Sequence, residues 1–146
     1  MRRILLVADV PWVLNEVRAS LSTAGNELVE TADPRTAAFA AREHAVDVVV
    51  VDLQVASMGG MAVTRDVRAR FGMAGESSPP VVMLLDRAAD GFLAKRAGAD
   101  AWVVKPFTPR QLRDALDRAM AAPPAPVGED VEDLTSTAEG GAIPAG

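Results

Sequence analysis

The amino-acid sequence predicts an α/β fold, in which a doubly wound parallel sheet carries helices on both faces. Five short apolar runs alternate with five segments of helical periodicity, the pattern of consecutive strand–helix units. The central run, residues 46–52, is nearly all valine, which is typical of an interior strand buried on both faces. It ends at Asp52, and polar residues also follow two other runs, at the edge where open parallel sheets bind ligands.

The five predicted strands share short runs of β-branched and large aliphatic side chains. In chain order they cover residues 4–7, 28–29, 46–52, 81–85 and 101–104.

Three helices are predicted in the first half of the chain. Pro11 opens the first helix, because proline is favoured at the first helical position, and Gly25 is placed to end it. Asp33 is the predicted N-cap before Pro34, which opens the second helix. The third helix covers about residues 60–71 and follows the central strand.

Two helices are predicted in the second half. A short helix at about residues 90–97 stops at Gly98. The last helix begins at a capping box, Thr108 to Gln111, with Pro109 at its first position. Its apolar spacing predicts that it buries Leu112, Ala115, Leu116 and Met120.

Composition limits the chemistry open to this chain of 146 residues. It has no cysteine, which excludes disulfides and thiolate chemistry and fits a cytoplasmic location. The single histidine, His44, is expected at the surface, so neither a histidine-rich metal site nor a Ser-His-Asp triad is expected. The amino-terminal apolar run is too short for a signal peptide or a membrane span, and we expect no direct membrane insertion.

Charge divides the chain into a predicted domain, residues 1–121, and an acidic tail, residues 122–146. The domain has 15 acidic and 15 basic groups, whereas the tail has five acidic groups and no basic one. Neither part has the excess of basic residues that is typical of nucleic-acid binding, so we expect no nucleic-acid partner. The tail is rich in Pro, Ala and Gly and cannot bury enough apolar surface to fold alone. We expect it to be disordered or to be ordered by a partner. Its candidate anchors are Val131, Leu134 and Ile143.

Three predicted strand ends bring together Asp9, Asp52 and Lys105. Carboxylate oxygens are the ligands that Mg²⁺ prefers, and a metal ion and an ammonium group together neutralise a transferring phosphoryl group. Asp52 is then the candidate nucleophile, which forms an aspartyl-phosphate. Two simpler interpretations stay open: Asp52 caps the following loop, or Lys105 and Asp9 form an ordinary ion pair.

Four segments in this order resemble the receiver domain of two-component response regulators. They are ILLVADVP at residues 4–11, DVVVVDL at residues 47–53 with Met58 and Gly60, PVVML at residues 80–84, and AGADAWVVKPF at residues 97–107. Each segment is weakly diagnostic alone, but in this order and spacing they are highly specific. The resemblance covers about residues 2–121, nearly the whole predicted domain.

The resemblance implies a flavodoxin-like (βα)5 fold with strand order 2-1-3-4-5. It implies that Asp52 is the phosphoacceptor, which receives phosphate from a histidine kinase, and that Asp9 and Asp52 hold Mg²⁺. Lys105 matches the lysine that contacts the phosphate. The peptide between Lys105 and Pro106 is expected to be cis.

Two site positions depart from the family pattern. Ala8 replaces the first of two acids at the end of the first strand, so we expect weak Mg²⁺ binding. Leu85 replaces the Ser or Thr that bonds the phosphoryl group, a hydrogen bond to a charged partner worth about 1.5–3 kcal/mol. Trp102 matches the aromatic residue that moves on phosphorylation. Without a hydroxyl at residue 85, we expect Trp102 to stay in place.

These features predict an atypical, single-domain response regulator that acts through protein–protein contacts and is not an enzyme. We expect it to be independent of phosphorylation or weakly phosphorylated, and to be an accessory subunit of a large multi-subunit complex, such as a respiratory complex. The alternative is a working phosphoacceptor, Asp52, in a two-component phosphorelay. No effector domain is expected in the 25 residues of the tail. A flavodoxin-type cofactor protein is rejected, because the acidic and apolar loop at residues 8–12 offers no cradle for a cofactor phosphate.

Overall fold

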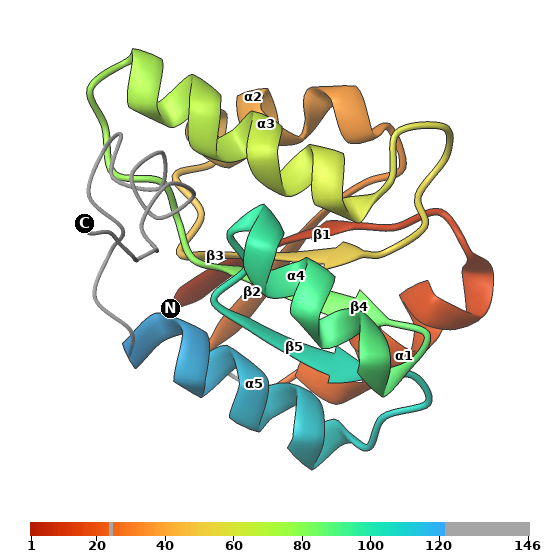
Figure 1. The fold of residues 1–146 in the computed structure, drawn as a ribbon. Helices are drawn as coiled ribbons and strands as arrows, with labels where there is room; N and C mark the ends of the chain where they lie inside the picture. The colour runs from red at the N-terminus through yellow and green to blue at the C-terminus, as the bar shows by residue number, and fades with distance from the viewer. Residues whose placement is uncertain (24, 122–146) are drawn as a thin grey trace.

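The computed structural model describes residues 1–23 and 25–121. In this part of the chain five strands form one sheet in the order β2-β1-β3-β4-β5 (Figure 1). The strands are β1 (Arg2–Val7), β2 (Asn26–Thr31), β3 (Val48–Asp52), β4 (Val81–Leu85) and β5 (Ala101–Val104). All neighbouring strands are parallel, so their carboxyl ends lie along one edge of the sheet. The predicted fold class and strand order are confirmed.

Helices cover both faces of the sheet. They are α1 (Pro11–Leu21), α2 (Ala37–Glu43), α3 (Gly60–Met73), α4 (Gly91–Ala97) and α5 (Pro109–Ala121), with short 3-10 turns η1 (Pro34–Thr36) and η2 (Ala88–Asp90). α1 and α5 pack on one face, and α2, α3 and α4 pack on the other (Figure 1). In β3, Val48 and Val50 belong to the core beneath α1 and α5, whereas Val49 and Val51 belong to the core beneath α2, α3 and α4. An all-valine run therefore supplies both faces of the central strand.

Several predicted helix signals lie at helix ends, although Asp33 caps the 3-10 turn η1 that leads into α2. The Asp33 carboxylate accepts a hydrogen bond from the backbone N–H of Arg35 at 3.0 Å. In the capping box, the Thr108 N–H donates to the Gln111 side chain at 2.8 Å and the Gln111 N–H donates to the Thr108 hydroxyl at 3.1 Å. Gly98 follows α4 in the left-handed conformation, with φ of 99°. These local bonds satisfy backbone groups that a helix end leaves unpaired.

Three sequence predictions need correction. α1 ends at Leu21, and Gly25 lies in the turn into β2, where its carbonyl accepts from the Arg2 N–H at 2.6 Å. β2 has six residues, not two, because pairing with β1 extends it through polar residues at the sheet edge. Met120 is 38% exposed, and Ala119 is buried instead, since it continues the 3-4 spacing of the buried face of α5.

The predicted tail lies outside the described residues, and so do its candidate anchors Val131, Leu134 and Ile143. Among the residues that are described, no helix is both long enough and apolar enough to cross a membrane.

Candidate functional site

Asp52 is the last residue of β3, and its side chain is 1% exposed. α3 begins close to this strand end: the Gly60 N–H donates to the Leu53 carbonyl at 2.7 Å. A Cβ atom at residue 60 would collide with the backbone carbonyl oxygen of Asp52. Glycine at this position therefore lets α3 begin directly against the backbone at the end of β3.

Lys105 follows β5 and reaches the same carboxylate. Its Nζ lies 2.5 Å from Oδ1 of Asp52 and 3.0 Å from Oδ1 of Asp86, and its side chain is 8% exposed. The Lys105 N–H donates to the Leu85 carbonyl at 2.7 Å, which continues the β4–β5 ladder past the end of β5. The peptide between Lys105 and Pro106 is cis, as predicted.

The second oxygen of Asp52, Oδ2, is buried and makes no hydrogen bond with the described part of the chain. A buried acceptor without a partner is costly, because it has lost water and gained no bond in return. Unpaired groups of this kind mark sites where a ligand completes the bonding.

Asp9 lies at the same edge but does not pair with Lys105. Within residues 1–23 and 25–121, the ion pairs of Lys105 are with Asp52 and Asp86, so the interpretation of a Lys105–Asp9 pair is wrong. Asp9 instead accepts a hydrogen bond from the Ala56 N–H at 2.9 Å. This bond ties the end of β1 to the loop after Asp52.

The pKa values at this edge follow from burial and charge. Burial raises the pKa of Asp52, and the contact with Lys105 only partly opposes this effect. Burial alone would lower the pKa of Lys105, but its hydrogen bonds to Asp52 and Asp86 outweigh burial and raise it. Lys105 therefore stays charged. The edge holds three carboxyl groups, those of Asp9, Asp52 and Asp86, and one ammonium group, so it attracts a cation.

The donor chemistry of this edge fits Mg²⁺. The carboxylates of Asp9 and Asp52 supply hard oxygen ligands, and Mg²⁺ is commonly held by one or two carboxylates while it keeps several waters. The described residues contain no group of three His, Cys, Asp or Glu side chains placed to hold a metal. Ala8 is one reason, because it lies within the apolar core and adds no carboxylate.

Asp86 is a site residue that the sequence analysis missed. It directly follows β4, at the same sheet edge as the other three side chains, and its carboxylate binds Lys105. The rule that selected Asp52 could have found it, since Asp86 is also a carboxylate at a strand end.

The other departing position, Leu85, belongs to the core under α3 and α4, and Trp102 is partly buried against the same core. Leu85 is fully buried there and offers no hydroxyl at the end of β4. Trp102 packs against the first residue of α4: a Cβ atom on Gly91 would lie 2.7 Å from the indole Nε1. The two residues therefore fill apolar space behind the site.

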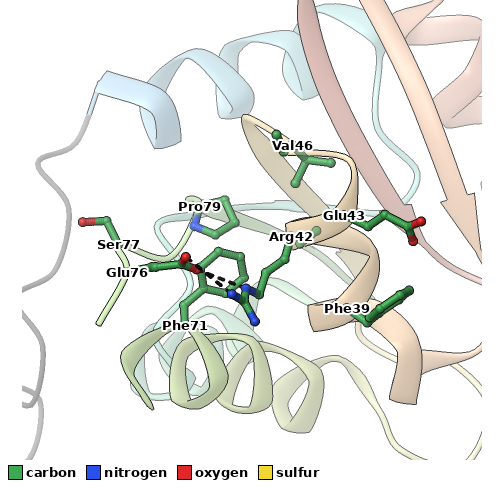
Figure 2. A pocket seen from close by; sticks show the side chains of 10 residues that line it. Phe39, Arg42, Glu43, Val46, Phe71, Glu76, Ser77 and Pro79 are labelled. Carbon is green, nitrogen blue, oxygen red and sulfur yellow. Dashed lines mark hydrogen bonds and ion pairs between the residues drawn. The ribbon is translucent and has the colours of Figure 1, made fainter. Parts of the chain in front are cut away.

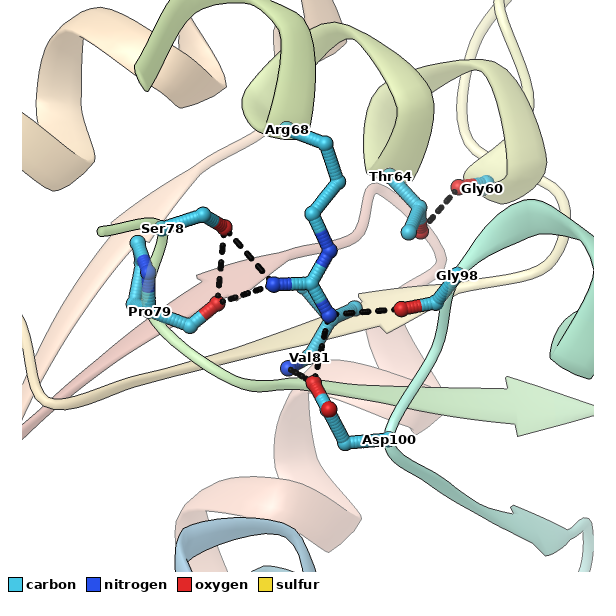
Figure 3. A network of polar contacts seen from close by, with 8 residues as sticks. All are labelled: Gly60, Thr64, Arg68, Ser78, Pro79, Val81, Gly98 and Asp100. Atoms are coloured by element: carbon cyan, nitrogen blue, oxygen red, sulfur yellow. Dashed lines mark hydrogen bonds and ion pairs between the residues drawn. The ribbon is translucent and has the colours of Figure 1, made fainter. Parts of the chain in front are cut away.

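The opposite, amino-terminal edge of the sheet holds a hollow and a polar network. A hollow lined by residues of α2, α3 and the connection to β4 opens there (Figure 2). Nearby, Arg68 of α3 donates to Ser78, Pro79, Gly98 and Asp100 (Figure 3). Asp100 also accepts from the Val81 N–H at 2.8 Å, so this network joins α3 to the starts of β4 and β5.

The fold and the site together define a flavodoxin-like α/β domain with a carboxylate–lysine cluster at the carboxyl edge of its sheet. Residues 4–117 match the family model of the response regulator receiver domain, and the chain belongs to this family. It is therefore a receiver domain of a response regulator, a component of two-component systems.

Two relatives are transcriptional regulators. The chain is 34% identical over 128 residues to the transcriptional regulatory protein KdpE of Mycobacterium tuberculosis, which covers 84% of this chain and 54% of that protein. It is 34% identical over 113 residues to the DNA-binding response regulator MtrA of Mycolicibacterium smegmatis, which covers 76% of this chain and 47% of that protein. The chain thus spans about half the length of these regulators.

Solved structures show the same fold. The chemotaxis protein CheY4 of Vibrio cholerae is 30% identical with a TM-score of 0.70, covering 82% of this chain and 98% of that chain. The receiver domain of the sensor histidine kinase PA1611 of Pseudomonas aeruginosa is 25% identical, also with a TM-score of 0.70, covering 83% and 98%. The PA1611 structure contains a magnesium ion coordinated in its active site cleft.

Proposed function

We propose that this receiver accepts a phosphoryl group on Asp52, and that phosphorylation is only weakly coupled to its protein-binding surfaces. One observation carries the proposal: Lys105 holds one oxygen of Asp52, while the other oxygen is buried without a partner. A carboxylate arranged in this way has a charged anchor on one side and a free nucleophilic oxygen on the other.

The proposed step is a phosphoryl transfer from a phosphohistidine of a sensor kinase. Oδ2 of Asp52 attacks phosphorus, the P–N bond breaks, and the imidazole nitrogen keeps the electron pair and takes up a proton. Lys105 neutralises charge on the phosphoryl oxygens. Asp9 and Asp52 would hold Mg²⁺, which when bound neutralises the remaining charge on those oxygens. The Mg²⁺ seen in the PA1611 receiver supports this role, and Ala8 argues for weak binding.

Weak coupling follows from Leu85 and Trp102. Leu85 has no hydroxyl to bond a phosphoryl group, so phosphorylation supplies no new bond at the end of β4. Trp102 is already packed against Gly91 and has no phosphate-dependent reason to move. We therefore propose that partner proteins bind this domain almost equally well with and without the phosphoryl group.

A second candidate is an atypical receiver that is never phosphorylated and serves only as a protein-binding module. The buried Leu85 favours it, because this substitution removes the link between the site and the surface. None of the relatives described above is named as a subunit of a larger assembly, and neither candidate includes a respiratory or other complex.

The wider proposal concerns the chain as a whole. We propose that residues 1–121 form the receiver domain and that residues 122–146 form a separate acidic tail. We further propose a cytoplasmic protein without enzymatic output, whose neutral domain does not itself bind nucleic acid. DNA binding in MtrA is a property of a protein about twice as long.

The experiment is Mg²⁺-dependent phosphorylation of the whole chain by a small phosphodonor, read by intact mass. We expect one phosphoryl group on the parent protein and none on Asp52→Asn. An Asp86→Asn variant is the matched control. It changes a carboxylate that binds the same lysine but leaves Asp52 in place, so it should still be phosphorylated. A phosphoryl group retained by Asp52→Asn would refute the assignment. No adduct on the parent at saturating Mg²⁺ would refute the first candidate and support the second.

A further inference from the structure

Two adjoining hollows open on the face formed by α2 and α3. The larger has a volume of about 660 Å³ and lies between the carboxyl ends of these helices and the connection to β4 (Figure 2). Val46 and Phe71 belong to its lining and are nearly buried. Phe39 lies at its rim with 69% of its surface exposed. Exposed apolar side chains that gather in one patch mark interaction sites, and Phe39 adds to the apolar lining of this hollow.

The smaller hollow, of about 430 Å³, shares Phe39 and Arg42 with the larger one. Its lining combines apolar side chains with three arginines and includes no carboxylate. These residues, named here the arginine hollow, are Arg35, Ala38, Phe39, Arg42, Arg70, Met73 and Ala74. Met73 is 86% exposed, so two large apolar side chains stand among the arginines.

Each arginine already has an acidic neighbour. The pairs are Arg35–Asp33 at 3.3 Å, Arg42–Glu76 at 3.1 Å and Arg70–Asp66 at 2.9 Å. All three arginine side chains are at least half exposed, and exposed ion pairs of this kind are weak. Because a guanidinium has five N–H donors, each arginine can donate to a further carboxylate and keep its present ion pair.

The sequence contains a segment with matching chemistry. Residues 129–134 read Glu-Asp-Val-Glu-Asp-Leu, with four carboxylates and two apolar residues, Val131 and Leu134. The tail carries all of the excess negative charge of the chain, and the segment carries four of its five acids. Its composition complements an apolar surface lined with arginines.

The end of α5 lies on the route to these hollows. The Met120 sulfur is 3.7 Å from Nη1 of Arg2, and the neighbouring Arg3 donates to the His44 carbonyl at 3.0 Å. Val46, two residues after His44, lines the larger hollow. Residues 122–128 include three prolines, and a Pro-rich spacer of this length extends about 20 Å at about 3.1 Å per residue.

We propose that residues 129–134 bind the arginine hollow and the adjoining hollow of the same molecule. The carboxylates contact Arg35, Arg42 and Arg70, while Val131 and Leu134 pack against Phe39 and Met73. The short spacer gives the segment a high effective concentration at this surface, which favours its own domain over a separate partner. The segment thereby covers the α2–α3 face, away from Asp52, so this inference does not rest on the proposed function.

The test uses the whole chain, which has no cysteine and so accepts a single spin label. A Thr135→Cys variant labelled with a nitroxide is compared with its reduced, diamagnetic form by nitrogen-15 NMR. We expect loss of the amide signals of α2 and of the carboxyl half of α3, and unchanged signals in the amino-terminal halves of α1 and α5. Arg42→Glu combined with Arg70→Glu should restore the lost signals. Arg110→Glu combined with Arg118→Glu makes the same charge change on α5 and should leave them lost.

Signal loss spread evenly over all helices, or centred on α4, would overturn the proposal. A second experiment tests whether the segment binds another copy of the chain instead. It mixes protein that carries the spin label but no nitrogen-15 with protein that carries nitrogen-15 but no spin label. Signal loss in that mixture would place the segment on a second copy of the chain and would equally overturn binding within one molecule. The spectra also report whether each variant is folded.

Discussion

A Cβ atom built on Gly91 would lie 2.7 Å from the indole nitrogen of Trp102, so the first residue of α4 and the middle of β5 are in direct contact. Trp102 is partly buried and packs against the core beneath α3 and α4. α4 can approach β5 this closely only because residue 91 has no side chain. The position of α4 is therefore coupled to the size of the residue at position 102.

Gly91→Ala should destabilise the domain by about 1–3 kcal/mol, since the indole or α4 must move. Elsewhere in a helix the same change usually stabilises by about 0.5–1 kcal/mol, so the sign of the effect is itself a test. Denaturant unfolding measures it. Trp102→Phe in the Gly91→Ala background should recover most of the loss, and strictly additive effects would contradict the contact.

Lys105→Met should cost about 3–5 kcal/mol of the free energy of unfolding at neutral pH, because it leaves the buried Asp52 carboxylate without its cation. Urea unfolding checks this value. The double variant Asp52→Asn with Lys105→Met should be more stable than Lys105→Met alone, since no buried charge is then left unpaired. Equal stability of these two variants would show that the pair is not coupled.

The stability of the parent relative to Asp52→Asn should fall as pH rises. Because burial raises the pKa of Asp52 above its ordinary value of 3.8, the folded domain holds this proton to a higher pH than the unfolded chain does. The stabilisation that this bound proton gives is therefore complete below pH 3.8. It is lost as pH rises through the raised pKa of Asp52. Unfolding of both proteins over a pH series measures the trend.

Leu85→Thr should restore a phosphate-dependent response at Trp102 and should cost about 2–4 kcal/mol of stability, because a buried leucine is lost and a hydroxyl is buried. Trp12→Phe provides the background in which Trp102 is the single tryptophan. In that background we expect phosphorylation to leave the fluorescence of the parent unchanged and to alter that of Leu85→Thr. Leu85→Val serves as the control without a hydroxyl, and a response in it would contradict the explanation.

Ala8→Asp should tighten Mg²⁺ binding by about tenfold, within the range by which supporting groups change metal affinity. Val7, the last residue of β1, pairs with Val51, so Ala8 follows at the level of Asp52. Without Mg²⁺ the variant should be less stable than the parent, because residue 8 is buried in the apolar core. Thermal unfolding over a Mg²⁺ titration measures both effects. Ala8→Asn, which adds a polar group without charge, should show the destabilisation with little gain in affinity.

The sequence by itself determined the type and order of the elements and three members of the site. The valine run of β3, the proline and capping-box helix starts, and the carboxylates and lysine at strand ends are local signals. Local signals are readable because backbone propensity and hydrophobic period act within a few neighbouring residues. Asp9, Asp52 and Lys105 were therefore found, and the parallel topology brings them to one edge.

Only the tertiary structure decided which of these groups touch. Lys105 binds Asp52 and Asp86 and leaves Asp9 to the Ala56 N–H. Pairing with β1 extended β2 through polar residues. The close approach of Gly91 to Trp102 likewise joins residues from separate elements. These outcomes depend on strand register and helix packing, which are set by contacts between segments distant in the chain and leave no local pattern in the sequence.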